Sequence, residues 1–318
     1  MKYCVGIDLG GTNIAVGVVN ENYEIVGRAQ TKTNCPRPAQ EILADMADVA
    51  RKAVEKAGLT MKDVECVGVG SPGSVNQDTG DIIYANNLGF RDVPMRKMLE
   101  KALGVPVYVE NDANAAAYGE FVAGAAKGVR NALMITLGTG VGGGIIIDNR
   151  IYSGTNHAAG ELGHMVVEKD GWQCTCGRKG CIEAYASATG LIRMTKEAME
   201  ADRSSKLWEI AGSPDKVDGK TAFDGMRAGD AAGKAVVDKY ISYLGTGLAN
   251  YVNIFQPEIL VIGGGICKEG ETLLAPLRDI LDKETYMVKE EDKCRLMKAQ
   301  LGNDAGIIGA AFLGRALK

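Results

Sequence analysis

Residues 5–19 read VGIDLGGTNIAVGVV, and residues 133–147 read LMITLGTGVGGGIII. Each stretch is an apolar run, a short turn of glycine and threonine, and a second apolar run. This pattern predicts two strands joined by a tight turn. Because the unit occurs twice, we expect the chain to hold two related domains. We place the first domain at residues 1–117 with a returning segment at 303–318, and the second domain at 118–302.

The rest of the chain alternates short apolar runs with amphipathic stretches, which is typical of an α/β fold. A helix is expected from about residue 40 to residue 56, because its apolar positions recur every three or four residues. Gly58 is expected to end this helix. Another helix is expected after Asp112. In the first half of the chain, strands are predicted at residues 3–8, 14–19, 24–31, 64–69 and 105–109. A later strand is predicted at 259–262, and a last helix is expected between 302 and 318.

The composition excludes several classes of protein. Hydrophobic residues make up 46% of the chain and charged residues 24%, so disorder is not its main state. Lys and Arg total 36 against 40 for Asp and Glu, and without a basic excess we expect no nucleic-acid partner. We see neither a secretory signal nor a run of about 18 apolar residues, so we expect a cytoplasmic protein without a membrane partner.

Eight cysteines in a cytoplasmic protein are not expected to form a disulfide framework. Five of them are scattered along the chain, and we expect these to be buried free thiols. They are Cys4, Cys35, Cys66, Cys267 and Cys294. The other three form a close group that has a different explanation, given below.

Both glycine turns suit phosphate binding, because successive backbone N–H groups can enclose an anion and glycine lets the backbone come close. Threonine hydroxyls would add donors. Asp8 ends the strand before the first turn, where a carboxylate can hold Mg²⁺ beside a phosphate chain. The residues expected around the phosphates are Gly10, Gly11, Thr12, Gly138, Thr139 and Gly140.

Two alternatives compete with a phosphate site. The turns could be plain hairpins without a ligand. Residues 138–143 also match the G-x-G-x-x-G pattern of dinucleotide-binding proteins, but an apolar run at 145–147 follows where that motif needs a helix. The glycines after the predicted strand at 259–262 are a further candidate, because Gly264 and Gly265 would stand at a strand end where an adenosine could bind.

Cys174, Cys176 and Cys181 lie within eight residues, and His164 precedes them. Three thiolates and one imidazole make a closed tetrahedral zinc set, so this zinc would be structural. Free thiols are the alternative. His157 is the other histidine of the chain, and we favour His164 as the fourth ligand.

Several polar residues near these motifs are candidate ligand contacts. Asp112 could be a general base for phosphoryl transfer, although it or Asn111 could equally be only a helix N-cap. Glu161 and Glu183 flank the zinc set, which would draw their carboxylates together as acceptors for the vicinal hydroxyls of a polyol ligand. A surface charge is the alternative for each glutamate. Asn87 is expected in a loop at the end of a predicted element.

Taken together, these motifs resemble the ROK family of sugar kinases and repressors over nearly the whole chain. The segments that carry the resemblance are Asp8 to Thr12, Glu110 to Asn114, Leu137 to Gly142, Gly160 to His164 and Cys174 to Glu183. The resemblance is greatest to the bacterial glucokinases of that family. It implies a two-domain actin-like (ribonuclease-H-like) α/β ATPase fold with an interdomain cleft.

The resemblance also implies a function, which is the transfer of phosphate from ATP, with Mg²⁺, to the 6-hydroxyl of D-glucose. Asp112 would be the catalytic base. The sugar would be held by Asn87, Asn111, Asp112, Glu161, His164 and Glu183, and the zinc by His164, Cys174, Cys176 and Cys181. The phosphates and nucleotide would lie at Asp8, the two glycine turns, Gly264 and Gly265. Relatives form homodimers or homotetramers, so an oligomer is expected.

Three other functions are alternatives to the glucokinase activity. A kinase for N-acetylmannosamine, N-acetylglucosamine or fructose would use the same acidic and zinc groups. A sugar-sensing repressor would carry a helix-turn-helix segment before its kinase-like part, and a first strand at residue 3 leaves no room for one. A zinc hydrolase would need an open metal position, and this ligand set is full.

Overall fold

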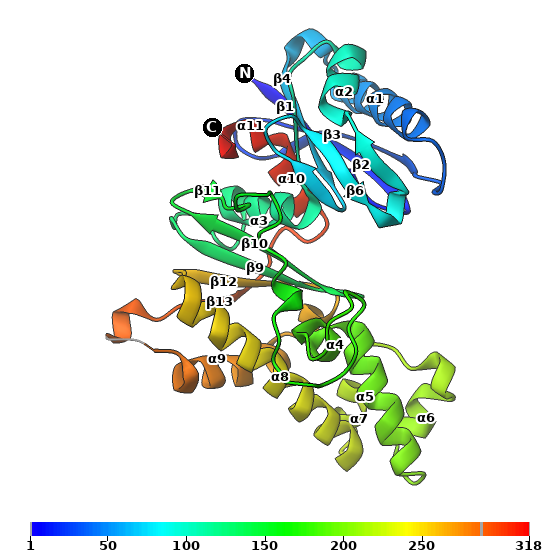
Figure 1. Ribbon diagram of the computed structural model, residues 1–318, viewed down its shortest axis with the longest axis vertical. Helices are drawn as coiled ribbons and strands as arrows, with labels where there is room; N and C mark the ends of the chain where they lie inside the picture. The colour runs from blue at the N-terminus through cyan, green and yellow to red at the C-terminus, as the bar shows by residue number, and fades with distance from the viewer. Residues whose placement is uncertain (1, 287–288, 318) are drawn as a thin grey trace. The chain divides into compact units, whose positions relative to one another are not determined.

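The computed structural model describes residues 2–286 and 289–317, and it divides into two compact units (Figure 1). Unit 1 comprises Met1–Leu133, Gly144–Gly160 and Ala299–Lys318, and unit 2 comprises Met134–Gly143 and Glu161–Lys298. The predicted boundary between residues 117 and 118 falls inside the continuous helix α3, so the two divisions differ there.

Unit 1 is built on a five-stranded sheet with the order β3-β2-β1-β4-β8. The three strands of the N-terminal meander are antiparallel, whereas β4 and β8 run parallel to β1. The last strand begins two residues later than predicted, because Pro106 has no N–H to donate to a ladder. The strands are β1 (Tyr3–Leu9), β2 (Asn13–Val19), β3 (Ile25–Lys32), β4 (Val64–Ser71) and β8 (Val107–Asn111).

Helices cover both faces of this sheet. The side chains of Val5 and Ile7 join a buried core with α1 (Ala39–Lys56) and α2 (Met95–Leu103). The predicted stop of α1 is confirmed, since Gly58 follows the C-cap with φ +72°. Successive residues of a strand face opposite sides of the sheet, so Gly6, between Val5 and Ile7, faces the other side.

That other face is covered by α10 (Asp304–Ala311), which also packs on α3 (Asp112–Ala123) and is followed by α11 (Leu313–Ala316). The approach is unusually close, because a Cβ atom at Gly6 or Gly68 would overlap a carbonyl oxygen of α10. Only glycine permits backbone to lie on backbone in this way.

A three-stranded sheet in unit 1, with the order β5-β6-β7, was not predicted. Its strands are β5 (Ser74–Asn76), β6 (Asp81–Ala85) and β7 (Phe90–Val93), and the short 3-10 turn η2 (Asn86–Leu88) lies between β6 and β7. Asn87 lies in that turn. These strands have only three to five residues each, which is too short for a readable alternation.

The second five-stranded sheet has the order β11-β10-β9-β12-β13. As predicted, strand and not helix follows the glycines at 138–143, so the dinucleotide-binding alternative is excluded. The strands are β9 (Ala132–Leu137), β10 (Val141–Ile147), β11 (Arg150–Ile151), β12 (Ile259–Gly264) and β13 (Arg295–Lys298).

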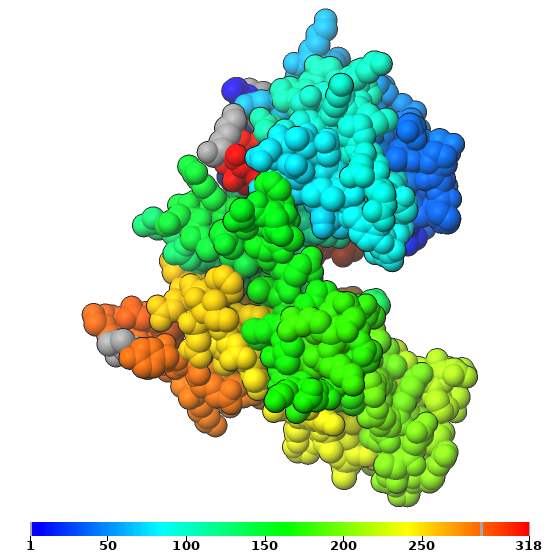
Figure 2. Space-filling view, in the orientation of Figure 1, coloured from blue at the N-terminus to red at the C-terminus, as the bar shows by residue number. Residues whose placement is uncertain are grey.

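The helices of unit 2 include the long α8, against which α4, α5, α7 and α9 pack. Figure 2 shows α5 to α7 as a closed green to yellow-green surface at one end of unit 2. The helices are α4 (Ile182–Ala186), α5 (Ala188–Ala201), α6 (Leu207–Ala211), α7 (Thr221–Arg227), α8 (Ala231–Phe255) and α9 (Glu271–Glu284). Within the described ranges, none of these or the other helices combines the length and apolar character needed to span a bilayer.

The scattered cysteines are free thiols, as predicted, but not all of them are buried. Cys4, Cys66 and Cys267 are buried, whereas Cys35 and Cys294 are half-buried. The prediction of burial was wrong for these two because they lie in connections, Cys35 before α1 and Cys294 before β13, where only part of the side chain is covered.

Candidate functional site

The first glycine turn joins β1 to β2 and is held by one backbone hydrogen bond and one side-chain hydrogen bond. The Gly10 N–H donates to the Asn13 carbonyl at 2.9 Å, and the Thr33 hydroxyl donates to the Gly10 carbonyl at 2.6 Å. A Cβ placed on Gly11 would lie 3.9 Å from the Cβ of Asn87. The turn thus lies next to Asn87, one of the predicted ligand contacts.

Asp8 and Asp112 lie close enough in unit 1 to influence each other. Burial, followed by repulsion from Asp112, raises the pKa of Asp8 to about 6. Burial also raises the pKa of Asp112, while the Ala113 N–H opposes this by donating to the Asp112 carboxylate at 2.9 Å. Two partly desolvated acids at the ends of β1 and β8 make a strong site for a cation or for a proton.

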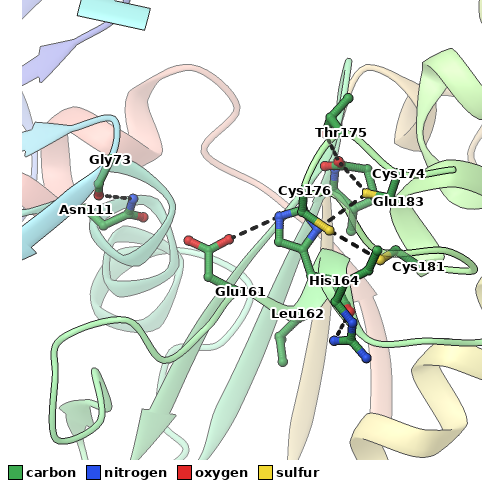
Figure 3. Close-up of polar contacts among 12 residues, drawn as sticks. Gly73, Asn111, Glu161, Leu162, His164, Cys174, Thr175, Cys176, Cys181 and Glu183 are labelled. Atoms are coloured by element: carbon green, nitrogen blue, oxygen red, sulfur yellow. Dashed lines mark hydrogen bonds and ion pairs between the residues drawn. The ribbon is translucent and has the colours of Figure 1, made fainter. Parts of the chain in front are cut away.

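Asn111 is the N-cap of α3. Its Oδ1 accepts from the N–H groups of Ala113 and Asn114 at 2.9 and 3.3 Å, and its Nδ2 donates to the Gly73 carbonyl at 3.1 Å (Figure 3). The sequence left open whether Asn111 or Asp112 has the capping role, and the structure gives it to Asn111. Asp112 is the first residue of the helix, where the N-terminal dipole favours a negative charge.

Glu110 is a residue to which the sequence analysis gave no role. It is only 2% exposed. It accepts from the Asn111 N–H at 2.7 Å, from Asn114 Nδ2 at 3.0 Å, and from the Gln77 amide. Burial raises the pKa of Glu110, while these hydrogen bonds oppose the rise. Glu110 therefore fixes the junction from which Asn111 and Asp112 project, and a glutamate at the end of a buried strand was the available signal.

The four predicted zinc ligands lie together in unit 2. His164 belongs to the 3-10 turn η3 (Leu162–His164), and the ligand atoms of the four residues are all within 4.8 Å of one another. His164 Nδ1 lies 3.7 Å from Cys174 Sγ, and Cys176 Sγ lies 3.6 Å from Cys181 Sγ (Figure 3). Thiolates on one tetrahedral zinc are about 3.8 Å apart, so the donor set fits that metal.

His157 is not part of this cluster. It lies in unit 1, and its Nε2 is 3.6 Å from a carboxylate oxygen of Asp78. The choice of His164 over His157 agrees with this geometry.

The loop that carries the cysteines has the tight turns that its glycines predict. Gly177 and Gly180 have φ +90° and +78°, which is left-handed backbone that favours glycine. The Cys174 N–H donates to the Arg178 carbonyl at 2.9 Å, closing the turn between the thiols.

The two glutamates lie on either side of the thiol and imidazole cluster. Glu161 is exposed, and its Oε2 is 3.8 Å from His164 Nε2, the ring nitrogen that faces away from Cys174. Glu183, in α4, accepts from the Thr175 hydroxyl at 3.3 Å and from the Val141 N–H at 3.0 Å (Figure 3). The zinc-ligand loop thus brings both carboxylates into one region of unit 2.

The second glycine turn, between β9 and β10, lies beside Glu183. A Cβ on Gly140 would collide with the Glu183 carboxylate. The Ala188 N–H donates to the Gly138 carbonyl at 2.8 Å, and the Thr189 hydroxyl donates to the Thr139 carbonyl at 2.8 Å. The turn is therefore tied to the start of α5.

Gly264, the last residue of β12, and Gly265 lie near the same strand end. Gly264 has φ +86° and abuts the backbone of Leu137, the residue before the second turn. A Cβ at Gly265 would have open space around it. Gly264 and Gly265 thus lie close enough to the second glycine turn to contact a ligand that is bound there.

Comparison with known proteins places this arrangement in a family. A model of the ROK family matches residues 4–316. The chain belongs to the ROK family. It is 40% identical over 314 residues to a glucokinase from Halalkalibacterium halodurans, covering 98% of this chain and 94% of that protein.

A crystal structure of a ROK family glucokinase from Streptomyces griseus, in complex with glucose and AMPPNP, matches with a TM-score of 0.79. The two are 38% identical, covering 98% of this chain and 99% of that chain. A xylose repressor from Caldicellulosiruptor bescii is 30% identical over 287 residues, covering 90% of this chain and 71% of that protein. The predicted family and its α/β ATPase fold are confirmed, and ROK members of more than one function are similar to this chain.

Proposed function

We propose that this ROK protein is an ATP-dependent glucokinase, which transfers the γ-phosphoryl group of ATP to the 6-hydroxyl of D-glucose. The names of its relatives support this, since the H. halodurans protein is a glucokinase and the S. griseus glucokinase was crystallised with glucose and AMPPNP. The observation that carries the proposal is the placement of Asp112, a desolvated carboxylate at the start of α3.

Asp112 is the proposed catalytic base. Its neighbour Asn111 satisfies the helix N-terminus, so the Asp112 carboxylate is not needed as the cap. In phosphoryl transfer the base mainly orients the attacking hydroxyl and accepts its proton late, so a moderate pKa is sufficient. Glu110 would hold Asp112 in place through the Asn111 backbone.

The sugar hydroxyls would be bound by the remaining predicted residues. In unit 2 these are Glu161, His164 and Glu183, and in unit 1 Asn87 and Asn111. With Nδ1 directed at the thiols, His164 keeps Nε2 for a sugar hydroxyl. The zinc, held by His164 and the three cysteines, would supply folding energy to this loop.

The phosphate chain of ATP would be bound by the two glycine turns. Their backbone N–H groups supply hydrogen-bond donors. Asp8 would hold Mg²⁺ through a water molecule, and the metal ion neutralises phosphate charge when it is bound. The predicted residues of this part are Asp8, Gly10, Gly11, Thr12, Gly138, Thr139 and Gly140, with Gly264 and Gly265 toward the nucleoside.

An ADP-release assay on the zinc-loaded protein tests the proposal. The panel comprises glucose, mannose, fructose, N-acetylglucosamine and N-acetylmannosamine, each with MgATP. We expect the highest kcat/KM for glucose. A preference for an N-acetylated hexose would change the assigned substrate while leaving ATP-dependent phosphoryl transfer as the reaction. Absence of turnover with every sugar, in folded protein, would reject the kinase and favour a sugar sensor.

A further inference from the structure

Cys4 and Cys66 form a thiol pair in unit 1, away from the zinc ligands. They are register partners on the parallel strands β1 and β4, and their Sγ atoms are 3.4 Å apart. Neighbouring strands lie about 4.8 Å apart, which is within the Cα separation that a disulfide spans. Both side chains point to the face covered by α10, since Cys66 Sγ lies 3.7 Å from the Ala311 carbonyl oxygen.

The pair opens into a cavity of about 190 Å³ that is lined by both thiols, Tyr108 and Arg315. The residues are not sealed, since Cys4 is 5% and Cys66 is 8% exposed. A peroxide is close to water in size, so a molecule of this class fits the cavity. Reagents too large for the cavity would not reach the sulfur atoms.

The surroundings distinguish the two sulfur atoms. The Cys66 thiol donates a hydrogen bond to Cys4 Sγ, and this bond together with the Arg315 charge lowers the pKa of Cys4 against the effects of burial and Glu65. The same hydrogen bond, together with burial, raises the pKa of Cys66. Cys4 is thus the better nucleophile of the pair, and Cys66 holds the proton.

We propose that Cys4 and Cys66 are a peroxide-reactive dithiol that closes reversibly to a disulfide within unit 1. The Cys4 thiolate attacks one peroxide oxygen, the O–O bond breaks, and a sulfenic acid forms as hydroxide leaves. Cys66 then gives its proton to that hydroxide, and its sulfur attacks the Cys4 sulfur. The S–S bond forms, and the sulfenic oxygen leaves as hydroxide. This hydroxide takes up the proton that the Cys4 thiol lost when the thiolate formed, and it becomes the second water. The two thiols lose two electrons, and hydrogen peroxide is reduced to two waters.

Peptide mapping tests this directly on the wild-type, zinc-loaded protein. Hydrogen peroxide is added and then removed, and the protein is unfolded in denaturant that contains N-ethylmaleimide, so that buried free thiols are blocked. The digest is then analysed by mass spectrometry. We expect a linked peptide pair containing Cys4 and Cys66, lacking two hydrogens and released by dithiothreitol. Cys4 and Cys66 should lose their maleimide labels together, at the same rate.

Variants separate this chemistry from general oxidation. In Cys66→Ser, Cys4 should stop at the sulfenic acid and become labelled by dimedone that is added together with the denaturant, whereas Cys35→Ser should still form the linked pair. Complete maleimide labelling of both residues after peroxide, while other thiols are oxidised, would overturn the proposal. Oxidation of Cys4 alone in the wild-type protein, without the linked peptide, would overturn it as well.

Discussion

The substitution Asp8→Asn is expected to stabilise unit 1, and to do so more at high pH than at low pH. Burial and the Asp112 charge raise the pKa of Asp8 from 3.8 to about 6. The folded state therefore binds this proton more tightly than the unfolded state does. The stabilisation that comes from this tighter proton binding is fully present below the pKa that Asp8 has in the unfolded state. It is lost as pH rises through about 6, the pKa of Asp8 in the folded state.

A rise of about two pKa units corresponds to at most ~3 kcal/mol, because each unit is worth about 1.4 kcal/mol. Asp8 is half-buried, so solvent screening reduces this to an expected gain of about 1.5 kcal/mol for Asp8→Asn at pH 8. At pH 5 the folded Asp8 is mostly protonated, and the gain should be roughly half as large.

The assay must report on unit 1. Both tryptophans, Trp172 and Trp208, lie in unit 2, so their fluorescence reports on the wrong part of the chain. Hydrogen–deuterium exchange of β1 and α10 peptides, in magnesium-free buffer at pH 5 and pH 8 with correction for intrinsic exchange, gives the opening free energy of unit 1.

Asp63→Asn is the matched control, also in unit 1. A backbone hydrogen bond from Thr60 lowers the pKa of Asp63 from its ordinary value of 3.8, so its stabilising contribution is lost only as pH falls below that value. Asp63→Asn should therefore lose the same stability at pH 5 as at pH 8. The reasoning is refuted if Asp8→Asn gives the same change at pH 5 and pH 8, or destabilises unit 1 at pH 8.

Three further outcomes are expected. Asp112→Asn should lower kcat by about 10²- to 10⁴-fold in the ADP-release assay while glucose binding, measured by calorimetry, persists; normal turnover would reject Asp112 as the base. Cys176→Ser should lower both the zinc content and the thermal midpoint, since the ligand set is left incomplete. Metal analysis with Cys35→Ser as control checks this, and unchanged zinc would contradict the cluster. Gly68→Ala should destabilise unit 1 by more than about 4 kcal/mol, because its methyl would overlap the Ala310 carbonyl. Gly58→Ala has open space and strains only its own left-handed backbone, so in the same exchange experiment it should cost far less.

The sequence predicted those parts of the structure whose signal is local. The runs around Asp8 and Leu137 read as strands because they are apolar on both faces, and sheets covered on both faces require this. The cysteine spacing predicted the cluster because three thiols within eight residues have few other uses. The helix stop at Gly58 follows from the left-handed conformation of one residue.

The parts that were missed depend on contacts between distant residues. A glutamate at the end of a buried strand is visible in the sequence, but its hydrogen-bond partners Gln77 and Asn114, which make its burial possible, are not. The strands β5 to β7 are too short for periodicity to appear. The proposed domain boundary at residue 117 lies within α3, an Ala-rich helix that gives no break in composition.

The close packing of α10 on β1 and β4 determines when the sheet of unit 1 can be covered during synthesis. The residues of this helix, 304–311, cover the sheet face of β1 and β4, whose strands are made first. Synthesis runs from the N-terminus, so the glycine-lined face of that sheet stays bare while residues 161–298 of unit 2 leave the ribosome and can begin to fold. Until α10 arrives, that exposed backbone and apolar surface is available to chaperones. Translational arrest before residue 304 should therefore give chains whose β1 amides exchange freely.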